Sequence, residues 1–334
     1  GRTIVSRKRI MVTGAGGYIG TTLVPLLLKA GHEVVAIDRY FFGRDLLAPH
    51  EHLTIIETDA RRMEADMFTG VDAVVDLVAI SNDPSGERFQ AATWQINRDA
   101  RIQTARMAKD AGVPRYLLPS SCSIYGFVGP DVTVSETSDI NPLTTYAHAN
   151  RAAEEGTLAL ADDDFVVTVV RQATLYGLSP RMRFDVAVNG MTIGAARTGR
   201  LPLMRDGTQW RPMLHVRDAA RGQMLMLEAA AGDVNGEIFN LGSNDQNVQL
   251  APLGERVAGA LTNDVQIEWY GDPDHRSYRV DFSKIAALGY APQSTIEDAV
   301  HEIEAAYRAG SVDRTPETIT LDWYERIGAF TDDG

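Results

Sequence analysis

The sequence predicts an α/β fold with a doubly wound parallel sheet. Short apolar runs alternate with longer helical patterns through the first half of the chain. The runs are almost continuously apolar, as is typical of parallel strands covered on both faces. A loop with three spaced glycines separates the first run from the first helical pattern. With 334 residues, 44% of them hydrophobic, the chain is long enough for a large core and two lobes.

The first unit of this pattern is a strand, a glycine loop, a helix and a second strand. They correspond to residues 9–12, 13–20 (TGAGGYIG), 22–29 and 33–38. A carboxylate ends the second strand, and this arrangement is the Rossmann-type fingerprint of a dinucleotide-binding site. The glycine spacing is Gly-x-x-Gly-x-x-Gly rather than Gly-x-Gly-x-x-Gly. A glycine-rich turn in some other doubly wound protein is therefore the structural alternative.

Each glycine of the loop has a separate physical role. Gly14 allows the tight turn, Gly17 lets the backbone approach a pyrophosphate, and Gly20 lets the helix pack close to the strand. Free N–H groups at the helix start, together with the helix dipole, would hold the phosphates. Asp38 would accept the hydroxyls of an adenosine ribose and repel a 2′-phosphate, which predicts NAD rather than NADP. Arg39 argues against this choice of NAD over NADP, because an arginine at that position can hold the 2′-phosphate.

Further strands and helices follow in alternation. We predict strands at residues 53–56, 72–78, 115–118 and 165–170, and long helices at 93–111 and 145–161. After position 177 the pattern breaks into shorter pieces, with strand-like runs at 213–216 and 238–241. We expect a Rossmann-type sheet lobe over residues 1–176, joined by returning segments near 212–243. Residues 177–334 would mainly form a smaller C-terminal α/β substrate-binding lobe, with a cleft between the two.

Composition disfavours several classes of function. The net charge of −13 argues against nucleic acid and anionic membranes as general partners, and no apolar run approaches the length of a membrane span. Cys122 is the only cysteine, so an internal disulfide is impossible and a cytoplasmic location is expected. The seven histidines show no metal-ligand spacing, and we expect no metal site.

Three motifs together resemble a known family. They are residues 13–20, residues 120–126 (SSCSIYG) after the fifth strand, and residues 146–150 (YAHAN) at the start of a long helix. In this combination the chain resembles the extended short-chain dehydrogenase/reductases, and within them the NAD-dependent epimerase/dehydratase group that acts on nucleotide sugars. The resemblance runs from about Arg9 to about residue 305. It implies an NAD cofactor and a nucleotide-sugar substrate.

The resemblance also implies roles for individual residues. Tyr146 would take the proton from a sugar hydroxyl, and Ser121 would hold the substrate oxygen. The implied cofactor contacts are Gly14, Gly17, Tyr18, Ile19, Gly20, Asp38, Arg39, Asp59, Ala60, Val78, Ala79, Asn97, Tyr146 and Asn150. The implied substrate contacts are Ser121, Ser123, Thr174, Asn189, Arg211, Arg276 and Arg279, the arginines as partners of a diphosphate.

Structural alternatives stand beside these roles. Asp59 could be a turn residue, and Asn97 is better explained as structural than as catalytic. Arg211 could be an ordinary surface arginine, and His215, in an apolar run, is best explained as a core histidine. Cys122 follows Ser121, but no basic partner is visible that would make it a nucleophile.

A homodimer is the expected assembly. The resemblance implies that the helices predicted at residues 93–111 and 145–161 form a four-helix interface between two copies. Small side chains in and before the first helix would permit close approach: Ala91, Ala92, Ala100, Ala105 and Ala108. The apolar faces of these helices could equally be covered within one chain.

The chain departs from the family pattern at Asn150. The family places a lysine four residues after the tyrosine, where it binds the nicotinamide ribose and favours the tyrosine phenolate. Asparagine carries no charge, and a free tyrosine has a pKa of about 10. Three explanations remain open: the charge of NAD⁺ suffices, Arg151 substitutes as the cation, or the site binds but turns over poorly. If the tyrosine limits turnover, Asn150→Lys should raise activity.

A second comparison with the family concerns the reaction. Nucleotide-sugar 4,6-dehydratases carry an Asp-Glu pair directly after the catalytic threonine, whereas this chain has Cys122 and Ser123 there. Dehydration is therefore disfavoured, and we expect an NAD-dependent epimerase that oxidises a ring carbinol transiently. The alternatives are a sugar reductase or dehydrogenase of the same fold, or a nucleotide-binding protein with weakened catalysis.

Overall fold

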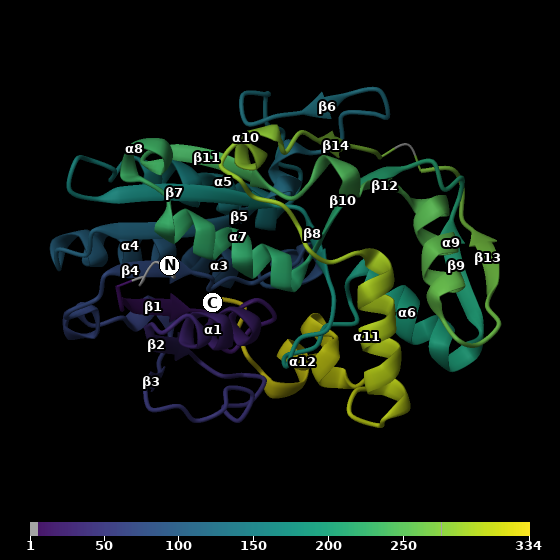
Figure 1. Ribbon diagram of the computed structural model, residues 1–334, viewed down its shortest axis with the longest axis horizontal. Helices are drawn as coiled ribbons and strands as arrows, with labels where there is room; N and C mark the ends of the chain where they lie inside the picture. The colour runs from purple at the N-terminus through teal and green to yellow at the C-terminus, as the bar shows by residue number, and fades with distance from the viewer. Residues whose placement is uncertain (1–5, 275) are drawn as a thin grey trace, which may run out of the picture.

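The computed structural model describes residues 6–274 and 276–334. Its largest element is a parallel sheet of seven strands in the order β11-β7-β5-β4-β1-β2-β3 (Figure 1). These strands are β1 (Arg9–Thr13), β2 (Glu33–Asp38), β3 (Leu53–Glu57), β4 (Ala73–Asp76), β5 (Arg115–Ser121), β7 (Val166–Gln172) and β11 (Glu237–Leu241). The strand order reverses between β1 and β4, as in a doubly wound Rossmann-type sheet, so the predicted fold class is confirmed.

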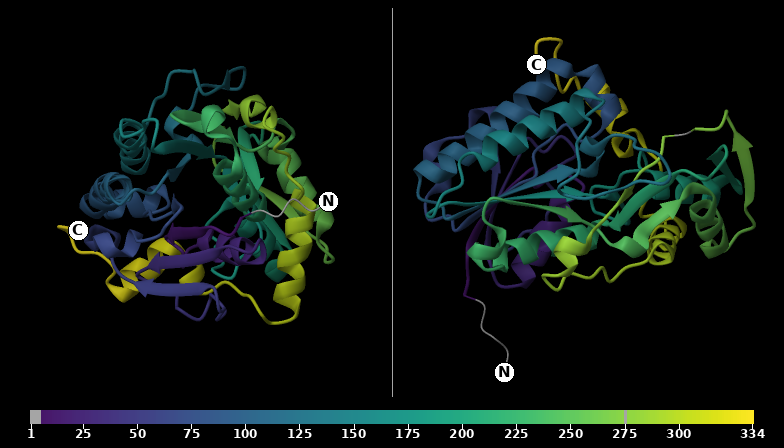
Figure 2. Two further views of the ribbon diagram at one scale, coloured as in Figure 1. Left: turned by 60° about the vertical axis from the view of Figure 1, so that its left-hand side comes forward. Right: turned by 90° about the horizontal axis from the view of Figure 1, so that it is seen from above.

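Helices cover both faces of this sheet (Figure 2). Side chains alternate across a strand, so Ile10 and Val12 of β1 pack on the face that carries α1 (Gly20–Lys29) and α7 (Val216–Glu228). Met11 points to the other face, beneath α4 (Arg101–Asp110) and α5 (Thr145–Leu158). Among the described residues, no helix combines the length and the apolarity needed to cross a bilayer.

The helix predicted at residues 93–111 is widened in its first half. It consists of α3 (Gln90–Thr93), a wider-turn π-type segment η3 (Trp94–Ala100) and α4. The η3 segment carries Asn97, whose side chain accepts from Ile80 N at 2.8 Å and donates to Ile80 O at 2.9 Å. This pair of hydrogen bonds fixes the loop after β4, and it gives Asn97 the structural role that the sequence favoured.

The second lobe is built from shorter pieces. Its helices α6 (Ala187–Thr198), α9 (Leu250–Ala260) and α11 (Ile296–Arg308) pack on one apolar cluster. The smaller sheets are β12-β10-β8, β13-β9 and β14-β6. Their strands are β6 (Thr133–Val134), β8 (Thr174–Tyr176), β9 (Arg200–Met204), β10 (Trp210–His215), β12 (Asn247–Gln249), β13 (Gln266–Tyr270) and β14 (Arg279–Val280). The run predicted at 213–216 thus belongs to a small sheet, whereas the run at 238–241 joins the large one.

The chain ends by returning to the first lobe. Helix α12 (Thr320–Ile327) brings Tyr324 against Phe41 and Phe89, and the Trp323 indole nitrogen donates to Phe41 O at 2.7 Å. The remaining short helical segments are η1 (Ala60–Arg62), η2 (Ala65–Phe68), α2 (Asp83–Arg88), η4 (Cys122–Tyr125), α8 (Ala231–Val234), η5 (Asn244–Gln246), α10 (Ser283–Ala286) and η6 (Pro316–Thr318).

Four of the five alanines behind the dimer prediction are buried inside one chain, and Ala91 is half-buried. Ala92, Ala105 and Ala108 have no exposed surface, and Ala100 is 4% exposed. Ala105 and Ala108 pack beneath the helical layer against the large sheet. Their small size therefore serves the fit of η3 and α4 to their own lobe, and the dimer itself stays a prediction.

Candidate active site

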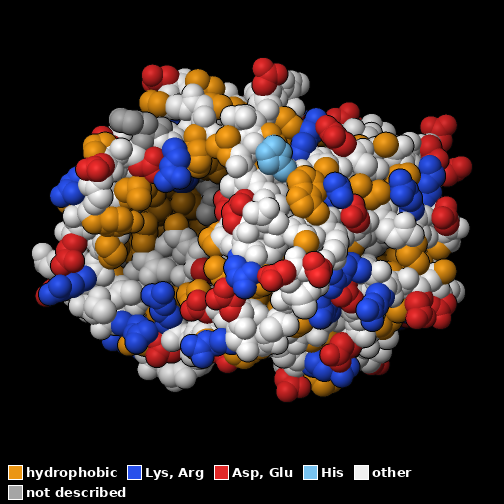
Figure 3. All heavy atoms as spheres, turned by 180° about the vertical axis from the view of Figure 1, so that it is seen from behind, with side chains coloured by type: hydrophobic (Ala, Val, Ile, Leu, Met, Phe, Trp, Pro, Cys, Tyr) orange, Lys and Arg blue, Asp and Glu red, His pale blue; other side chains and the backbone are white. Residues whose placement is uncertain are grey.

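A cavity of about 470 Å³ lies at the carboxyl ends of β1, β4 and β5, with walls from both lobes. Seen from behind, the surface is hollowed between the lobes, with hydrophobic side chains around the hollow (Figure 3). The cavity brings together fourteen of the residues predicted from the sequence: Gly14, Gly17, Tyr18, Ile19, Gly20, Asp38, Arg39, Asp59, Ala60, Val78, Ala79, Ser121, Tyr146 and Thr174.

The glycine loop has the shape that a dinucleotide requires. Gly14 has a φ of +65°, and a Cβ there would lie 2.7 Å from the backbone of Leu77. A Cβ on Gly20 would meet Gly14 O and would lie 2.6 Å from the Cα of Ala15. A Cβ on Gly17 would have only Gly14 O nearby, at 3.3 Å, so the outer side of this residue is open to the cavity. The residues present therefore fit an NAD diphosphate held against the backbone.

The loop also joins the two lobes. The Tyr18 hydroxyl donates to Gly177 O at 2.6 Å and accepts from Asn189 Nδ2 at 3.1 Å, and burial raises the pKa of Tyr18. The backbone N–H groups of Tyr18 and Ile19 have no acceptor among the described residues, so they are free to bind a phosphate. Asn189 has no exposed surface and lines neither cavity. It holds the loop at Gly177 rather than facing a substrate.

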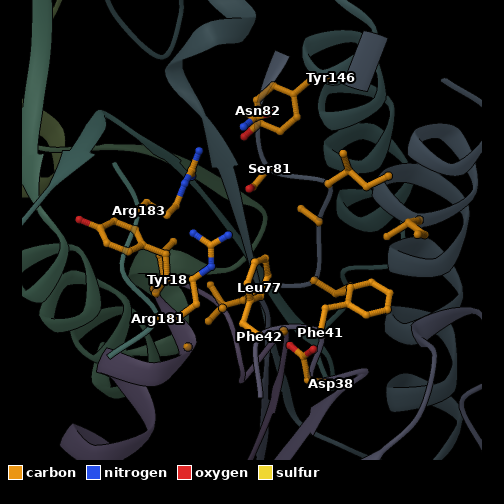
Figure 4. Close-up of a pocket in the computed structure, with 18 of the residues that line it drawn as sticks. Tyr18, Asp38, Phe41, Phe42, Leu77, Ser81, Asn82, Tyr146, Arg181 and Arg183 are labelled. Carbon is orange, nitrogen blue, oxygen red and sulfur yellow. The ribbon is translucent and has the colours of Figure 1, made fainter. Parts of the chain in front are cut away.

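The adenosine end of the cavity is marked by Asp38 (Figure 4). Its carboxylate accepts from Gly16 N at 3.0 Å and Tyr40 N at 2.7 Å. Burial raises the pKa of Asp38 in spite of these bonds. Arg39, the contrary sign in the sequence, lies 3.4 Å from Asp59 and 4.4 Å over the Phe41 ring. Because its charge is neutralised there, Arg39 is not poised to hold a 2′-phosphate.

Asp59 and its neighbour Ala60 line the same end of the cavity. The Asp59 carboxylate caps the short helix η1, where it accepts from Arg61 N at 2.9 Å and from Arg61 Nη2 at 2.8 Å. Burial acts to raise the pKa of Asp59, but the hydrogen bonds from Arg61 outweigh it and the pKa is lowered. Asp59 therefore caps a turn, as the structural alternative predicted, and it also lines the cavity.

Two arginines from the second lobe enter the cavity, and sequence reasoning missed them. Arg183 donates to Asp185 at 2.8 Å, and Asp185 in turn accepts from Asn82 at 3.0 Å. Arg181 donates only to Met182 O and the Thr320 hydroxyl, and no carboxylate of the described residues pairs with it. Burial, with the nearby charge of Arg183, lowers its pKa to about 10. Arg181 is thus an uncompensated cation close to the glycine loop, suited to a cofactor phosphate.

Aromatic side chains cover the same part of the cavity. Phe41 and Phe42 follow β2, whereas Tyr324 and Phe330 come from the C-terminal segment. The guanidinium of Arg181 lies 3.7 Å over the Phe42 ring. The pair of arginines after Pro180 was a signal that sequence reasoning could have used. Tyr324 and Phe330 gave none, because they reach the cavity from more than 280 positions beyond Asp38.

The end of the cavity that the sequence predicts to be catalytic holds Tyr146, at the start of α5 (Figure 4). Ser121, the last residue of β5, lines the same cavity. A second cavity of about 220 Å³ adjoins it and shares Asp83, Ser121, Gln172 and Thr174 with the first. Ser121 Oγ accepts from Ser123 N at 3.1 Å. Ser121 therefore stands between a compartment suited to a dinucleotide and a second one open to another ligand, whereas Tyr146 lines only the first.

Buried polar contacts fix helix α5 beneath this end. Glu154 has no exposed surface, and it accepts from Arg171 at 2.7 Å and from the Ser120 hydroxyl at 2.6 Å. Arg151, weighed above as a substitute cation, instead pairs with Glu155 at 3.0 Å and Glu154 at 3.6 Å. The charge of Arg151 is paired with these carboxylates. The residue also lines neither cavity. The structure therefore speaks against Arg151 in that role.

The cation that reaches Asn150 on this helix is Arg101, for which the sequence predicted no role. Its Nη1 donates to the Asn150 carboxamide oxygen at 3.1 Å, and both side chains are buried. Arg101 is the first residue of α4, directly after the widened segment η3. No motif in the sequence connects positions 101 and 150, which meet only because α4 and α5 pack side by side.

Of the predicted substrate residues, Ser123, Thr174 and Arg211 line the second cavity. Arg211 Nη1 donates to the carbonyls of Trp210 and Arg276, each at 2.7 Å, and burial lowers its pKa. Arg276 and Arg279 line neither cavity. Their guanidinium groups bind elsewhere, on Asp274 at 2.8 Å and on the carbonyl of Pro130 at 2.9 Å.

Known proteins share this architecture. A model described as the NAD dependent epimerase/dehydratase family matches residues 10–242. The chain is 29% identical over 321 residues to UDP-glucuronic acid decarboxylase 6 of Arabidopsis thaliana, which covers 91% of this chain and 90% of that protein. Two solved structures are similar in fold. MoeE5 in complex with UDP-glucuronic acid and NAD has a TM-score of 0.78 at 27% identity, covering 90% of this chain and 99% of that one. UDP-N-acetylglucosamine 4-epimerase from Methanobrevibacter ruminantium M1 has a TM-score of 0.81 at 22% identity, covering 92% and 100%.

The matched region contains the glycine loop, Asp38, Ser121 and Tyr146. It therefore covers both ends of the cavity, and it confirms the predicted resemblance together with NAD as the cofactor and an enzymatic role. The chain belongs to the NAD-dependent epimerase/dehydratase family of extended short-chain dehydrogenase/reductases.

Proposed function

We propose that this protein is an NAD-dependent epimerase of a nucleotide-linked sugar. The observation that carries the proposal is the position of Ser121 at the junction of the two cavities, with Tyr146 in the wall of the first. A sugar ring at this junction would present its carbinol to both hydroxyl groups. Its diphosphate would reach Arg211 in the second cavity, where a partly desolvated guanidinium binds phosphate oxygens in pairs.

The residues at the junction perform the acid–base part of the reaction. Tyr146 would accept the carbinol proton while Ser121 donates a hydrogen bond to the substrate oxygen. The keto-sugar would then turn to present its other face, so that hydride returns to the opposite side of the same carbon and Tyr146 returns the proton to the oxygen, which inverts that carbon. Bound NAD supplies a hydride acceptor and donor for the carbinol carbon. Arg181 and the glycine loop hold the cofactor between the two steps. Because the hydride is returned, the reaction consumes neither cofactor nor reductant.

The side chains after Ser121 support this reaction over dehydration. Cys122 is 1% exposed, its thiol donates to Arg171 O, and burial raises its pKa. Ser123 is neutral and lines the second cavity. Neither can protonate a leaving hydroxyl group. Asp83 is the one carboxylate among the described residues that line both cavities, and its charge favours a neutral sugar over a uronic acid at the junction.

Decarboxylation of a nucleotide-linked uronic acid is the second candidate. The 29% identity to a protein named UDP-glucuronic acid decarboxylase supports it. The same oxidation of a ring carbinol, with Tyr146 as the base, would generate a keto group β to the carboxylate. CO₂ would then leave, the resulting enolate would take up a proton at the carbon that bore the carboxylate, and the hydride would return to the keto carbon. Like-charge repulsion from Asp83 is the argument against a uronate in this chain.

One experiment decides between these functions. Purified protein with NAD is incubated with UDP-glucose, UDP-N-acetylglucosamine and UDP-glucuronic acid, and the products are followed by NMR and mass spectrometry. An epimerase yields a product of unchanged mass and no net NADH. Loss of CO₂ from UDP-glucuronic acid would instead establish the decarboxylase, and stoichiometric NADH would establish a dehydrogenase. Tight NAD binding without any turnover on a wider panel of nucleotide sugars would contradict all three.

We also propose that the protein is a homodimer, as the family resemblance implies. The outer faces of α4 and α5 remain the candidate interface, because their inner faces are already covered. Sedimentation at micromolar concentration tests this. A single species of about the chain mass of 36.5 kDa would contradict it.

A further inference from the structure

Asn150 stands where the family has a lysine, and the structure shows what it contacts instead. Its side chain is 1% exposed, and its oxygen accepts from Arg101 Nη1 at 3.1 Å. A guanidinium can only donate, so the carboxamide must present its oxygen to Arg101 and its amide nitrogen to the opposite side. That nitrogen makes no hydrogen bond to any described residue, so its donor capacity is unused. Asn150, predicted as a cofactor contact, is not itself part of the lining of either cavity, whereas Tyr146, one turn earlier, lines the first.

Arg101 is itself a buried cation. It is 2% exposed, and its Nη2 donates to Pro119 O at 2.7 Å and to Asp76 O at 3.3 Å. These carbonyls lie at the carboxyl ends of β5 and β4, at the sheet edge that forms the cavity floor. Nε of Arg101 has no hydrogen-bond partner, and no carboxylate of the described residues pairs with the guanidinium within 4.0 Å. Its positive charge is therefore only partly compensated.

A purely structural explanation would make Arg101 the counter-charge of Asp76. The charge of Arg101 does act on Asp76, but the two side chains make no direct contact, and the hydrogen bonds to the Asp76 carboxylate come from the hydroxyl groups of Thr13 at 2.6 Å and Tyr116 at 2.5 Å. Burial raises the pKa of Asp76, although the charge of Arg101 and these hydroxyl donors act to lower it. The one hydrogen bond that Arg101 donates to a side chain of the described residues goes to Asn150, one helical turn beyond Tyr146.

We propose that Asn150 and Arg101 together replace the absent lysine: Asn150 supplies its hydrogen bond to the cofactor, and Arg101 supplies its positive charge. Asn150 would supply the hydrogen-bond donor from just behind the cavity wall, one helical turn beyond Tyr146, since Tyr146 lines the cavity and Asn150 itself does not. Arg101 is the positioning residue that orients Asn150 and places a positive charge behind it. The division is physically possible because a hydrogen bond needs contact whereas a charge in a poorly screened interior acts over several ångströms. The inference rests on the proposed function for the role of Tyr146, but its test needs NAD alone.

The proposal changes what Asn150→Lys should do. A lysine at position 150 would place an ammonium group beside the buried guanidinium of Arg101, and two like charges in contact disfavour each other. The single variant should therefore lose stability. Removing Arg101 at the same time relocates one charge instead of adding a second, so Arg101→Met with Asn150→Lys should recover.

The decisive measurement is the ratio of the dissociation constants for NAD⁺ and NADH. NAD⁺ carries a positive nicotinamide ring and NADH does not, so a nearby cation weakens only NAD⁺ binding. A unit charge at roughly 10 Å, with an effective dielectric constant of about 20, changes such a ratio by roughly tenfold. We expect the ratio to be lowest in Arg101→Met, equal in the wild type and the double variant, and highest in Asn150→Lys.

Controls separate this role from loss of folding. Arg115 is also a partly buried arginine that donates to three backbone carbonyls, at the opposite end of β5. Arg115→Met should lower thermal stability and leave the ratio unchanged. Arg101→Lys keeps the charge and should keep the ratio even where it loses stability.

The outcomes are distinct. If the ratio is the same in all four proteins, or if Asn150→Lys alone binds both cofactors as tightly as the wild type, Arg101 is not the substitute cation. Should Arg101→Met fail to fold, the comparison of Asn150→Lys with the double variant still tests the proposal, because the ratio should be higher in Asn150→Lys, and equal ratios in these two variants would contradict it. Failure to find a sugar substrate would bear on the proposed function and would leave these binding ratios untouched.

Discussion

The two ends of the cofactor cavity are built in different ways. At the adenosine end, the glycine loop and Asp38 are close in sequence, and each is held by backbone geometry. At the catalytic end, Arg101 of one helix contacts Asn150 of another, across α4 and α5, one helical turn beyond Tyr146. Backbone fit tolerates almost no substitution, whereas a charge can be supplied from several positions around a site. The comparison suggests that the binding end is fixed by shape and the catalytic end by electrostatics.

Removal of the catalytic phenol should have the largest effect. Tyr146→Phe should lower turnover by about 10²- to 10⁴-fold, the usual contribution of general acid–base catalysis, while NAD remains bound. Steady-state rates on the substrate found above, with calorimetry for NAD, measure both quantities. Tyr270→Phe, at an exposed tyrosine, is the matched control. Full activity in Tyr146→Phe would remove the catalytic half of the comparison.

Asp38 tests the binding end. Asp38→Ala should weaken NAD about 10- to 100-fold, since a hydrogen bond to a charged group contributes about 1.5–3 kcal/mol. Only the carboxylate form accepts two hydroxyl groups, and burial raises the pKa of Asp38. NAD affinity should therefore fall, as the pH is lowered, at a higher pH than for an ordinary aspartate. Asp72→Ala, at the other end of the sheet where Asp72 accepts from Arg9 N, should leave NAD binding intact. Equal losses in both variants would contradict the assignment.

A variant at Arg181 tests whether electrostatics also contribute to binding of the cofactor diphosphate. Arg181→Met should weaken NAD about tenfold and reduce the dependence of NAD binding on salt, because the variant loses an uncompensated cation near the glycine loop. Calorimetry at two ionic strengths checks this. An unchanged salt dependence would mean that the loop backbone alone holds the phosphates, which would sharpen the contrast between the two ends.

Asp83 should give the smallest effect. Asp83→Asn removes the carboxylate at the junction of the cavities and should improve the affinity for UDP-glucuronic acid relative to UDP-glucose by about fivefold, as relief of like-charge repulsion in a partly solvated site. Competition binding measures the ratio. A lower ratio in the variant would show that Asp83 contacts the uronate favourably, and it would strengthen the decarboxylase candidate.

The sequence by itself determined the fold class and the binding end. Alternating apolar runs predicted the parallel sheet, and the glycine loop with Asp38 predicted the dinucleotide site, because strand period, turn geometry and helix start are local properties of the chain. Ser121 and Tyr146 were found through motifs of a few residues. The widened segment η3 was missed, since a helical pattern does not distinguish an α turn from a π turn.

Only the tertiary structure decided how charges are arranged around the site. It brought Arg101 to Asn150, Arg181 to the glycine loop, and Tyr324 from the C-terminal helix to the adenosine end. It also removed Asn189 from the substrate-facing wall by burying it against Tyr18. These contacts join residues separated by tens to hundreds of positions, and no local pattern encodes them. Whether a buried charge is paired depends on which helices pack together, so the electrostatics of this active site follow from the assembled fold.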